Sequence, residues 1–133
     1  KLKKLSRKFN VEDKVEFKGW VSEEEKNTLM KECKFFVIPS IYESYGLAAL
    51  EIMSYGRPVV ATNVDGLPGT VKNGGILVDP KDPKALADAM NRLLADRDLR
   101  TELGKNARAV AETQNVKNTV DAVEAVYTKV LGE

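Results

Sequence analysis

Three short, mostly apolar runs lie in the middle of the chain and predict buried strands. They are Phe35–Pro39, Pro58–Thr62 and Ile76–Asp79, and continuous apolar runs of this kind are typical of parallel strands buried on both faces. Gly46–Tyr55, between the first two, has a helical composition and is followed by Gly56, a helix-ending residue. Strand, helix and strand at this spacing form a βαβ unit, which almost always crosses over right-handed. The pattern predicts an α/β fold with a parallel sheet and flanking helices.

The flanking segments carry one more strand pattern and several amphipathic helix patterns. Val15–Phe17 alternates like a short strand, and a capping box that starts at Ser22 predicts a helix over residues 23–34. Asp82 is a good N-cap for the next helix. The later helices are predicted from apolar stripes over Ala85–Leu94, Leu99–Val110 and Val116–Val130. No internal repeat or long linker interrupts residues 1–133, so we expect one domain.

The basic segment Lys1–Phe9 is open to two interpretations. It is a surface helix with Leu2, Leu5 and Phe9 turned inward, or a basic amphipathic anchor for a membrane or RNA. Acidic residues follow at positions 12 and 13, and no aromatic residue other than Phe9 is interleaved with the lysines. These features favour the surface helix.

Composition removes several kinds of chemistry. The 133 residues carry 21 Lys and Arg against 20 Asp and Glu, so the net charge of +1 predicts no nucleic-acid partner. The absence of histidine removes His-dependent nucleophile pairs and His-ligated metals, and we expect no metal site. Cys33 is the only cysteine, which points to a reducing, cytoplasmic setting. No apolar run approaches the roughly 20 residues of a membrane span.

The segment Pro39–Glu51 is the strongest candidate for a functional site. A buried strand ends at Pro39, a polar loop carries Glu43, and a helix starts near Gly46. In an open parallel sheet the ligand lies beyond the carboxyl ends of the strands. A helix N-terminus there favours a phosphate or diphosphate. The chain has neither a GxxxxGK[ST] nor a GxGxxG motif, so this is not one of the common phosphate loops.

The two carboxylates of this segment suggest how a ligand would lie. Glu43 and Glu51 are eight positions apart; if both were helical, they would lie about 12 Å apart along the axis and about 80° apart around it. That spacing is too wide for the paired carboxylates of a glycoside hydrolase, which lie within roughly 10 Å of each other. It suits one carboxylate on either side of a diphosphate, each accepting from sugar or ribose hydroxyls. The alternative is that neither carboxylate binds a ligand, Glu43 being a solvated loop acid and Glu51 a surface residue of the helix.

A second glycine cluster, Asn63–Gly69, follows the next strand and is expected to face the first loop. Its amides could wrap a phosphate or sugar, but Asp-Gly and Pro-Gly are ordinary turn formers, and composition alone favours turns. Tyr42 and Tyr45 could stack on a ligand or fill the crevice wall. Trp20 is expected in core or rim packing, and Cys33 as a small buried hydrophobe.

These residues together resemble the retaining GT-B glycosyltransferases of family 4, the glycosyl transferase group 1 type. Glu43 with seven residues before Glu51 resembles the family's EX7E motif, placed before Gly56–Ala61 as in that family. Val15–Ser22 and Gly75–Pro80 look like further family motifs, and the resemblance covers essentially the whole chain. It implies a nucleotide-sugar-binding, Rossmann-like domain, the C-terminal half of a GT-B architecture whose first two βα units are absent here.

The resemblance also implies roles for residues and a substrate. The parent enzyme would be a retaining hexosyltransferase that uses a nucleoside diphosphate sugar as donor and no cofactor. Glu43 would contact the donor sugar as the catalytic residue, and Glu51 would accept from the ribose hydroxyls. The donor would also be bound by the loop and helix start, and by the second glycine cluster, through Ser44, Tyr45, Gly46, Leu47, Asp65 and Gly66.

Two departures from the family pattern have consequences. The family loop G-G-x-P-E reads Asp65-Gly66-Leu67-Pro68-Gly69 here, so a carboxylate replaces a glycine and Gly69 replaces the usual Glu. The chain also starts inside a helix, which leaves the Phe35–Ile38 strand with an open edge. We therefore expect an isolated chain that lacks the acceptor domain and does not turn over. We also expect it to compensate for the open edge by strand swapping, by dimerising or by rearranging its sheet. The alternative is a non-catalytic α/β binding or assembly module that has kept the fold and lost the donor site.

Overall fold

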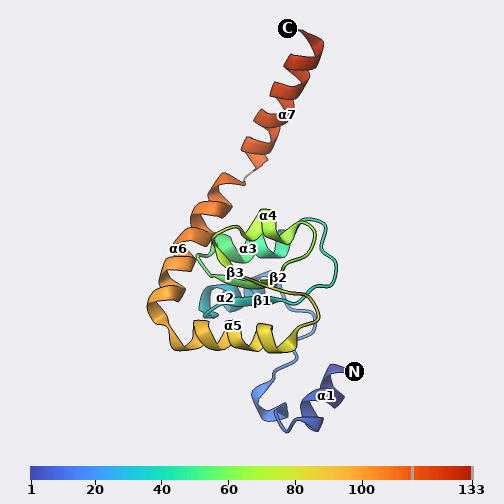
Figure 1. Cartoon of the computed structure of the whole chain (residues 1–133), viewed down its shortest axis with the longest axis vertical. Coiled ribbons are helices and arrows are strands. Elements are labelled where there is room, and N and C mark those ends of the chain that lie inside the picture. Colours follow the sequence, from blue (N-terminus) through green and yellow to red (C-terminus); the bar gives the residue numbers. More distant parts are fainter. Residues whose placement is uncertain (115, 133) are drawn as a thin grey trace.

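The computed structural model describes residues 1–114 and 116–132. A three-stranded parallel sheet lies between layers of helices (Figure 1). The strands are β1 (Phe36–Ile38), β2 (Val59–Thr62) and β3 (Gly75–Val78), in the spatial order β1-β2-β3. The helices are α1 (Leu2–Lys8), the 3-10 helix η1 (Glu12–Lys14), α2 (Glu23–Glu32), α3 (Leu47–Ser54), α4 (Leu67–Val71), α5 (Pro83–Ala95), α6 (Arg97–Thr113) and α7 (Val116–Leu131). The predicted α/β fold is confirmed.

The sheet is built around β2, the central strand. Val59 lies opposite Phe36 of β1 and Gly75 of β3, and the register continues without a bulge. All four residues of β2 are buried, because the strand has a neighbour on each edge and helices on both faces. This burial explains why the segment is apolar without alternation. The three central strands lie within one residue of their predicted bounds.

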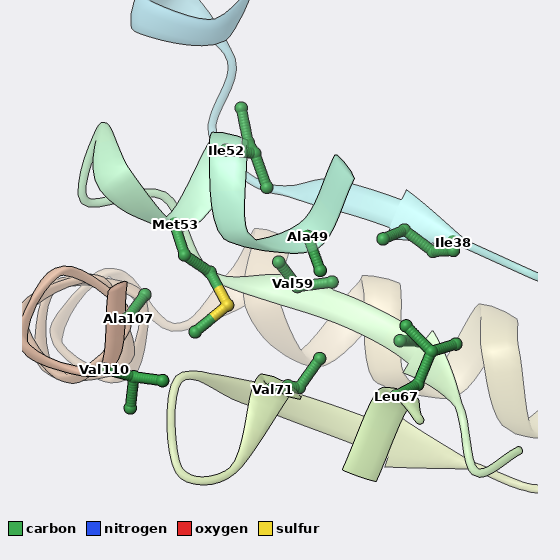
Figure 2. Close-up of a cluster of buried hydrophobic side chains, with 10 residues drawn as sticks. Ile38, Ala49, Ile52, Met53, Val59, Leu67, Val71, Ala107 and Val110 are labelled. Atoms are coloured by element: carbon green, nitrogen blue, oxygen red, sulfur yellow. The ribbon is translucent and has the colours of Figure 1, made fainter. Parts of the chain in front are cut away.

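The larger hydrophobic cluster lies between α3 and the sheet (Figure 2). Ile52 and Met53 of α3 are fully buried, and Figure 2 shows Met53 reaching toward α6. α4 and α6 complete this side of the core with short apolar side chains, among them Leu67, Val71, Ala107 and Val110. α3 and α6 therefore pack against each other although the sequence between them includes two strands.

A second cluster covers the opposite face of the sheet. Leu93 and Ala89 of α5 pack against Val60 of β2, and Leu93 is fully buried. The carboxylate of Asp82 accepts a hydrogen bond from the Ala85 N–H at 2.9 Å, which confirms the predicted N-cap. The helix start is therefore set by a local contact, and its position on the sheet by the apolar stripe.

The expected strand at Val15–Phe17 is wrong. These residues are not in a strand, and the sheet of the described part of the chain has only three strands. An alternating pattern becomes a strand only where a neighbouring strand supplies the backbone hydrogen bonds. No described strand lies beside this segment, and β1 is accordingly an edge strand, as expected.

The apolar faces of both terminal helices are exposed. Leu2 and Phe9 are 66% and 63% exposed, so the expectation that α1 turns its apolar residues inward is wrong. α7 extends away from the sheet in Figure 1, and Val130 is 75% exposed. Trp20 is fully exposed, which contradicts its expected packing role. The two helices have the periodicity of packed elements, but their apolar residues remain largely exposed in the described chain.

Candidate functional site

The candidate site lies at the carboxyl edge of the sheet. β1 ends at Ile38 and a loop leads from there to α3, while β2 ends at Thr62 and a loop leads to α4. Because β1 and β2 are parallel, both loops leave the same edge. The Thr62 hydroxyl donates to the Ser40 carbonyl at 2.6 Å and anchors the first loop where it leaves β1.

Two backbone contacts fasten the loops to each other. The Glu43 N–H donates to the Asp65 carboxylate at 3.2 Å, and the Gly66 N–H donates to the Glu43 carbonyl at 3.1 Å. Gly66 lies so close to the first loop that a Cβ there would be 2.3 Å from the Ser44 carbonyl oxygen. The predicted approach of the two segments is confirmed. Asp65 and Gly66 hold the conformation of the loop that carries Glu43.

The second glycine cluster is not only a turn. Residues 67–71 form the short helix α4, with Gly66 as N-cap and Pro68 in the first turn. Of the two turns expected here, the one at Asp65-Gly66 is confirmed, whereas the one at Pro68-Gly69 is wrong because these residues lie in α4. Leu67 is fully buried beneath α3, which explains why the chain turns into a helix here rather than continuing over the surface.

A closed set of hydrogen bonds links the first loop, α4 and the end of α6. The Thr70 hydroxyl donates to the Tyr45 carbonyl, and the Tyr45 hydroxyl donates to Gln114 Oε1 at 3.0 Å. Gln114 Nε2 donates to the Thr70 carbonyl at 3.3 Å. Thr70 and Gln114 were not predicted as site residues, because they lie 25 and 69 positions from Tyr45 and no local sequence pattern indicates the contact. Tyr45 itself is 47% exposed and lines a hollow beside α7.

The start of α3 is the part of the site best suited to an anion. Gly46 is its N-cap, with φ of 90°, and it supplies no side-chain cap. A Cβ at Gly46 would lie 2.9 Å from the Leu67 side chain, so both the backbone angle and the packing favour glycine. The first N–H groups of a helix have no intrahelical acceptor and carry partial positive charge. Leu47, the first residue of α3, is exposed, which leaves this end open to a ligand.

The two glutamates lie in different local structures. Glu43 is in the loop, half-buried, and Glu51 is on α3, so the spacing expected for two helical residues does not apply. The Glu51 carboxylate pairs with Lys26 of α2 at 2.8 Å, and Lys26 also pairs with Glu23. Hydrogen bonds to these two carboxylates raise the pKa of Lys26. Lys26 is a neighbour of the site that the linear sequence did not indicate.

Surface hollows lie on both sides of this edge. One of about 230 Å³ is lined by the ends of β1 and β2 and the start of α5, including Ile41, Thr62 and Asp79. Another, of about 660 Å³, lies between Tyr45 and the apolar side of α7, including Val123. Ser44, in the loop between β1 and α3, and Leu47, at the start of α3, are both exposed.

No group of three or more His, Cys, Asp or Glu side chains in residues 1–114 and 116–132 is placed to hold a metal ion. Over the same residues, no helix has both the length and the apolar character needed to cross a membrane.

The sequence and the fold both match known proteins. Residues 1–110 match the family model described as glycosyl transferases group 1. The D-inositol 3-phosphate glycosyltransferase of Corynebacterium urealyticum is 35% identical over 95% of this chain and 30% of its own length. The chain therefore spans about a third of the length of the curated relatives it matches.

Solved structures agree with this match. Sucrose-phosphate synthase from Thermosynechococcus elongatus has a TM-score of 0.86 and 34% identity, over 98% of this chain and 34% of that one. HepE of Anabaena in complex with UDP has a TM-score of 0.84 and 26% identity, over 96% of this chain and 36% of that one. A C-terminal domain of a group 1 glycosyl transferase from Francisella tularensis has a TM-score of 0.76 and 26% identity, over 85% of this chain and 60% of that one. The chain belongs to the group 1 glycosyl transferase family and has the Rossmann-like α/β fold of a GT-B C-terminal domain.

Proposed function

We propose that this chain is the donor-binding part of a retaining glycosyltransferase and binds a nucleoside diphosphate sugar. The observation that carries the proposal is the uncapped N-terminus of α3 at the carboxyl edge of the sheet, with Glu43 before it and Glu51 within it. HepE, a structural neighbour, has been solved with UDP and with UDP-glucose, which supports a donor of this class. No cofactor has a part in the proposal.

In this proposal the diphosphate lies against the backbone of Gly46 and Leu47. Free N–H groups there would donate to phosphate oxygens, and no local reorganisation is needed because Gly46 is already in its left-handed conformation. The fastened loop keeps the first turn open, since Asp65 and Gly66 hold Glu43 rather than the start of α3.

Glu51 would accept from the ribose hydroxyls and Glu43 would contact the sugar. The ion pair with Lys26 uses Oε1 of Glu51, so the second oxygen of the carboxylate can accept from a ribose. The carboxylate of Glu43 has no hydrogen bond or ion pair with the described residues, and it is half-buried beside the proposed phosphate position. Ser44 and Tyr45, which lie between Glu43 and Gly46 in the chain, would contact the same donor.

The test is an amide-resolved NMR titration with UDP, GDP and ADP in parallel. Saturable shifts at residues 45–48 are expected with one nucleotide. Glu51→Gln should lower the affinity for that nucleotide about tenfold or more, because a hydrogen bond to a charged acceptor contributes about 1.5–3 kcal/mol. Glu43→Gln should lower the affinity for the nucleoside diphosphate sugar and leave the affinity for the nucleoside diphosphate unchanged. Glu102→Gln, an exposed acid on α6, is the matched control.

Flat titrations with a well-dispersed spectrum would contradict donor binding. They would favour a non-catalytic α/β module that has kept the fold and lost the site. The specific observation for that alternative is Gly69, which stands on α4 where the family pattern has Glu.

Two finer expectations belong to this proposal. Residues 1–133 alone should not transfer sugar, because the acceptor would be bound by other parts of an enzyme about three times as long. Pairing of two copies along the open edge of β1 stays a prediction, which a molar mass measured by light scattering across a dilution series would test. The cytoplasmic location also stays a prediction.

A further inference from the structure

A hollow of about 600 Å³ lies at the opposite, amino edge of the sheet. It is next to the residues that precede β1 and β2 and to the first half of α6. Its charged lining residues are all cationic, Lys34, Arg57, Arg97, Arg100, Lys105 and Arg108, and no acidic residue lines it. The chain as a whole has a net charge of only +1, so this concentration of positive charge is local.

Three of the arginines satisfy the carbonyl groups at helix ends. Arg57 donates to the carbonyl of Lys31 near the end of α2, and Arg108 donates to that of Ser54 at the end of α3. Arg100 donates to the carbonyls of Leu93 and, at 3.0 Å, Leu94 near the end of α5. These bonds serve carbonyls that have no intrahelical donor. Each helix end contributes roughly half a negative charge, so the helices offset only part of the six positive charges.

Several other hydrogen-bond donors of the cationic side chains around the hollow have no acceptor within the described residues. Lys34, Arg97 and Lys105 are exposed and have no ion pair with the residues that the structure describes. Nε of Arg57 is buried and has no hydrogen-bond partner there. Arg108 pairs with Glu112 at 2.7 Å through Nε, and a guanidinium carries five donors in all. The hollow thus holds fixed guanidinium groups at its wall and three free cations around it.

We propose that this hollow binds a compact anion carrying two or more phosphate groups, at a site separate from the donor site. Guanidinium groups bind phosphate oxygens in a bidentate manner, and the arginines are already held in place by the helix ends. The volume suits a ligand of small-molecule size. No aromatic side chain lines the hollow, so nothing there would stack on a nucleotide base. This site lies at the edge of the sheet opposite Glu43 and Gly46, so it does not depend on the donor proposal.

The test is an NMR and calorimetric titration of the chain with inorganic pyrophosphate. We expect saturable amide shifts within residues 97–105 and around Arg57. The triple variant Lys34→Gln, Arg97→Gln, Lys105→Gln should weaken binding at least tenfold, because it removes the unpaired cations and leaves the helix-capping arginines in place. The matched control removes three lysines at the start of the chain instead, with Lys1→Gln, Lys4→Gln and Lys8→Gln. It should bind pyrophosphate as the unchanged chain does.

Four results would overturn the proposal. Equal weakening in both triple variants, or equal binding of chloride and pyrophosphate, would show a general charge effect. Shifts confined to residues 46–48 would place pyrophosphate at the donor site instead. If the chain sediments with vesicles of phosphatidylglycerol and phosphatidylcholine but does not bind pyrophosphate, the partner of the hollow is a membrane surface.

Discussion

Substituting Gly66 tests whether contact between the two loops shapes the candidate site. In Gly66→Ala the new methyl group would lie 2.3 Å from the Ser44 carbonyl oxygen and 2.8 Å from the Tyr45 Cα. Both neighbours are backbone atoms, so neither can move aside by a change of rotamer. The φ of Gly66 is −79°, which alanine adopts without strain. The cost of the substitution is therefore steric, and the loop carrying Glu43 must shift to relieve it.

The expected loss is that of an overpacked contact, about 1–3 kcal/mol in the free energy of unfolding. With a loss of about 2 kcal/mol and a urea m-value of about 2 kcal/mol per molar, the unfolding midpoint falls by about 1 M. The shift of the loop should also lengthen the contacts of the Glu43 backbone with Asp65 and Gly66. Nucleotide affinity should therefore fall together with stability.

Gly69→Ala is the matched control, because nothing lies within 4 Å of a Cβ at that position. Gly69 is within α4, where alanine is the better helix former by roughly 0.5–1 kcal/mol, so this variant should be equally stable or slightly more stable. Urea unfolding and an amide spectrum of both variants make the measurement. An unchanged midpoint in Gly66→Ala, with unshifted amides over residues 43–46, would refute the steric argument.

Three further predictions concern the core, a helix cap and the thiol. Leu93→Ala should lower the free energy of unfolding by about 3 kcal/mol, whereas Leu94→Ala, at a half-exposed position, should lower it by less than about 1 kcal/mol. Similar losses for the two variants in urea unfolding would contradict the burial of Leu93 against the sheet. Asp82→Ala removes the acceptor of the Ala85 N–H and should cost about 1 kcal/mol, with most of it recovered in Asp82→Asn, and a thermal melt would check this. Burial raises the pKa of the Cys33 thiol, so native alkylation at pH 8.5 should be several-fold slower than in urea, and equal rates would count against it. Because the unfolded thiol ionises first, its contribution to stability is lost as pH rises above the ordinary cysteine pKa.

Sequence alone determined the elements whose causes are local or strongly periodic. The three central strands were predictable because each is a short apolar run, and β2 is the clearest of them. The starts of α2 and α5 were predictable because Ser22 and Asp82 bond to backbone N–H groups three residues ahead. The family could also be identified, because the residue types around Glu43 and Glu51 are spaced along one continuous segment.

Tertiary structure alone decided which patterned segments are packed and how the site is held. Val15–Phe17 and α7 have suitable patterns, yet a strand needs a paired neighbour and an apolar face needs a covering surface. The contacts of Asp65 with Glu43 and of Lys26 with Glu51 join residues 22 and 25 positions apart. Such contacts depend on where loops and helices meet in space, and that information is spread over the whole fold rather than written in any one segment.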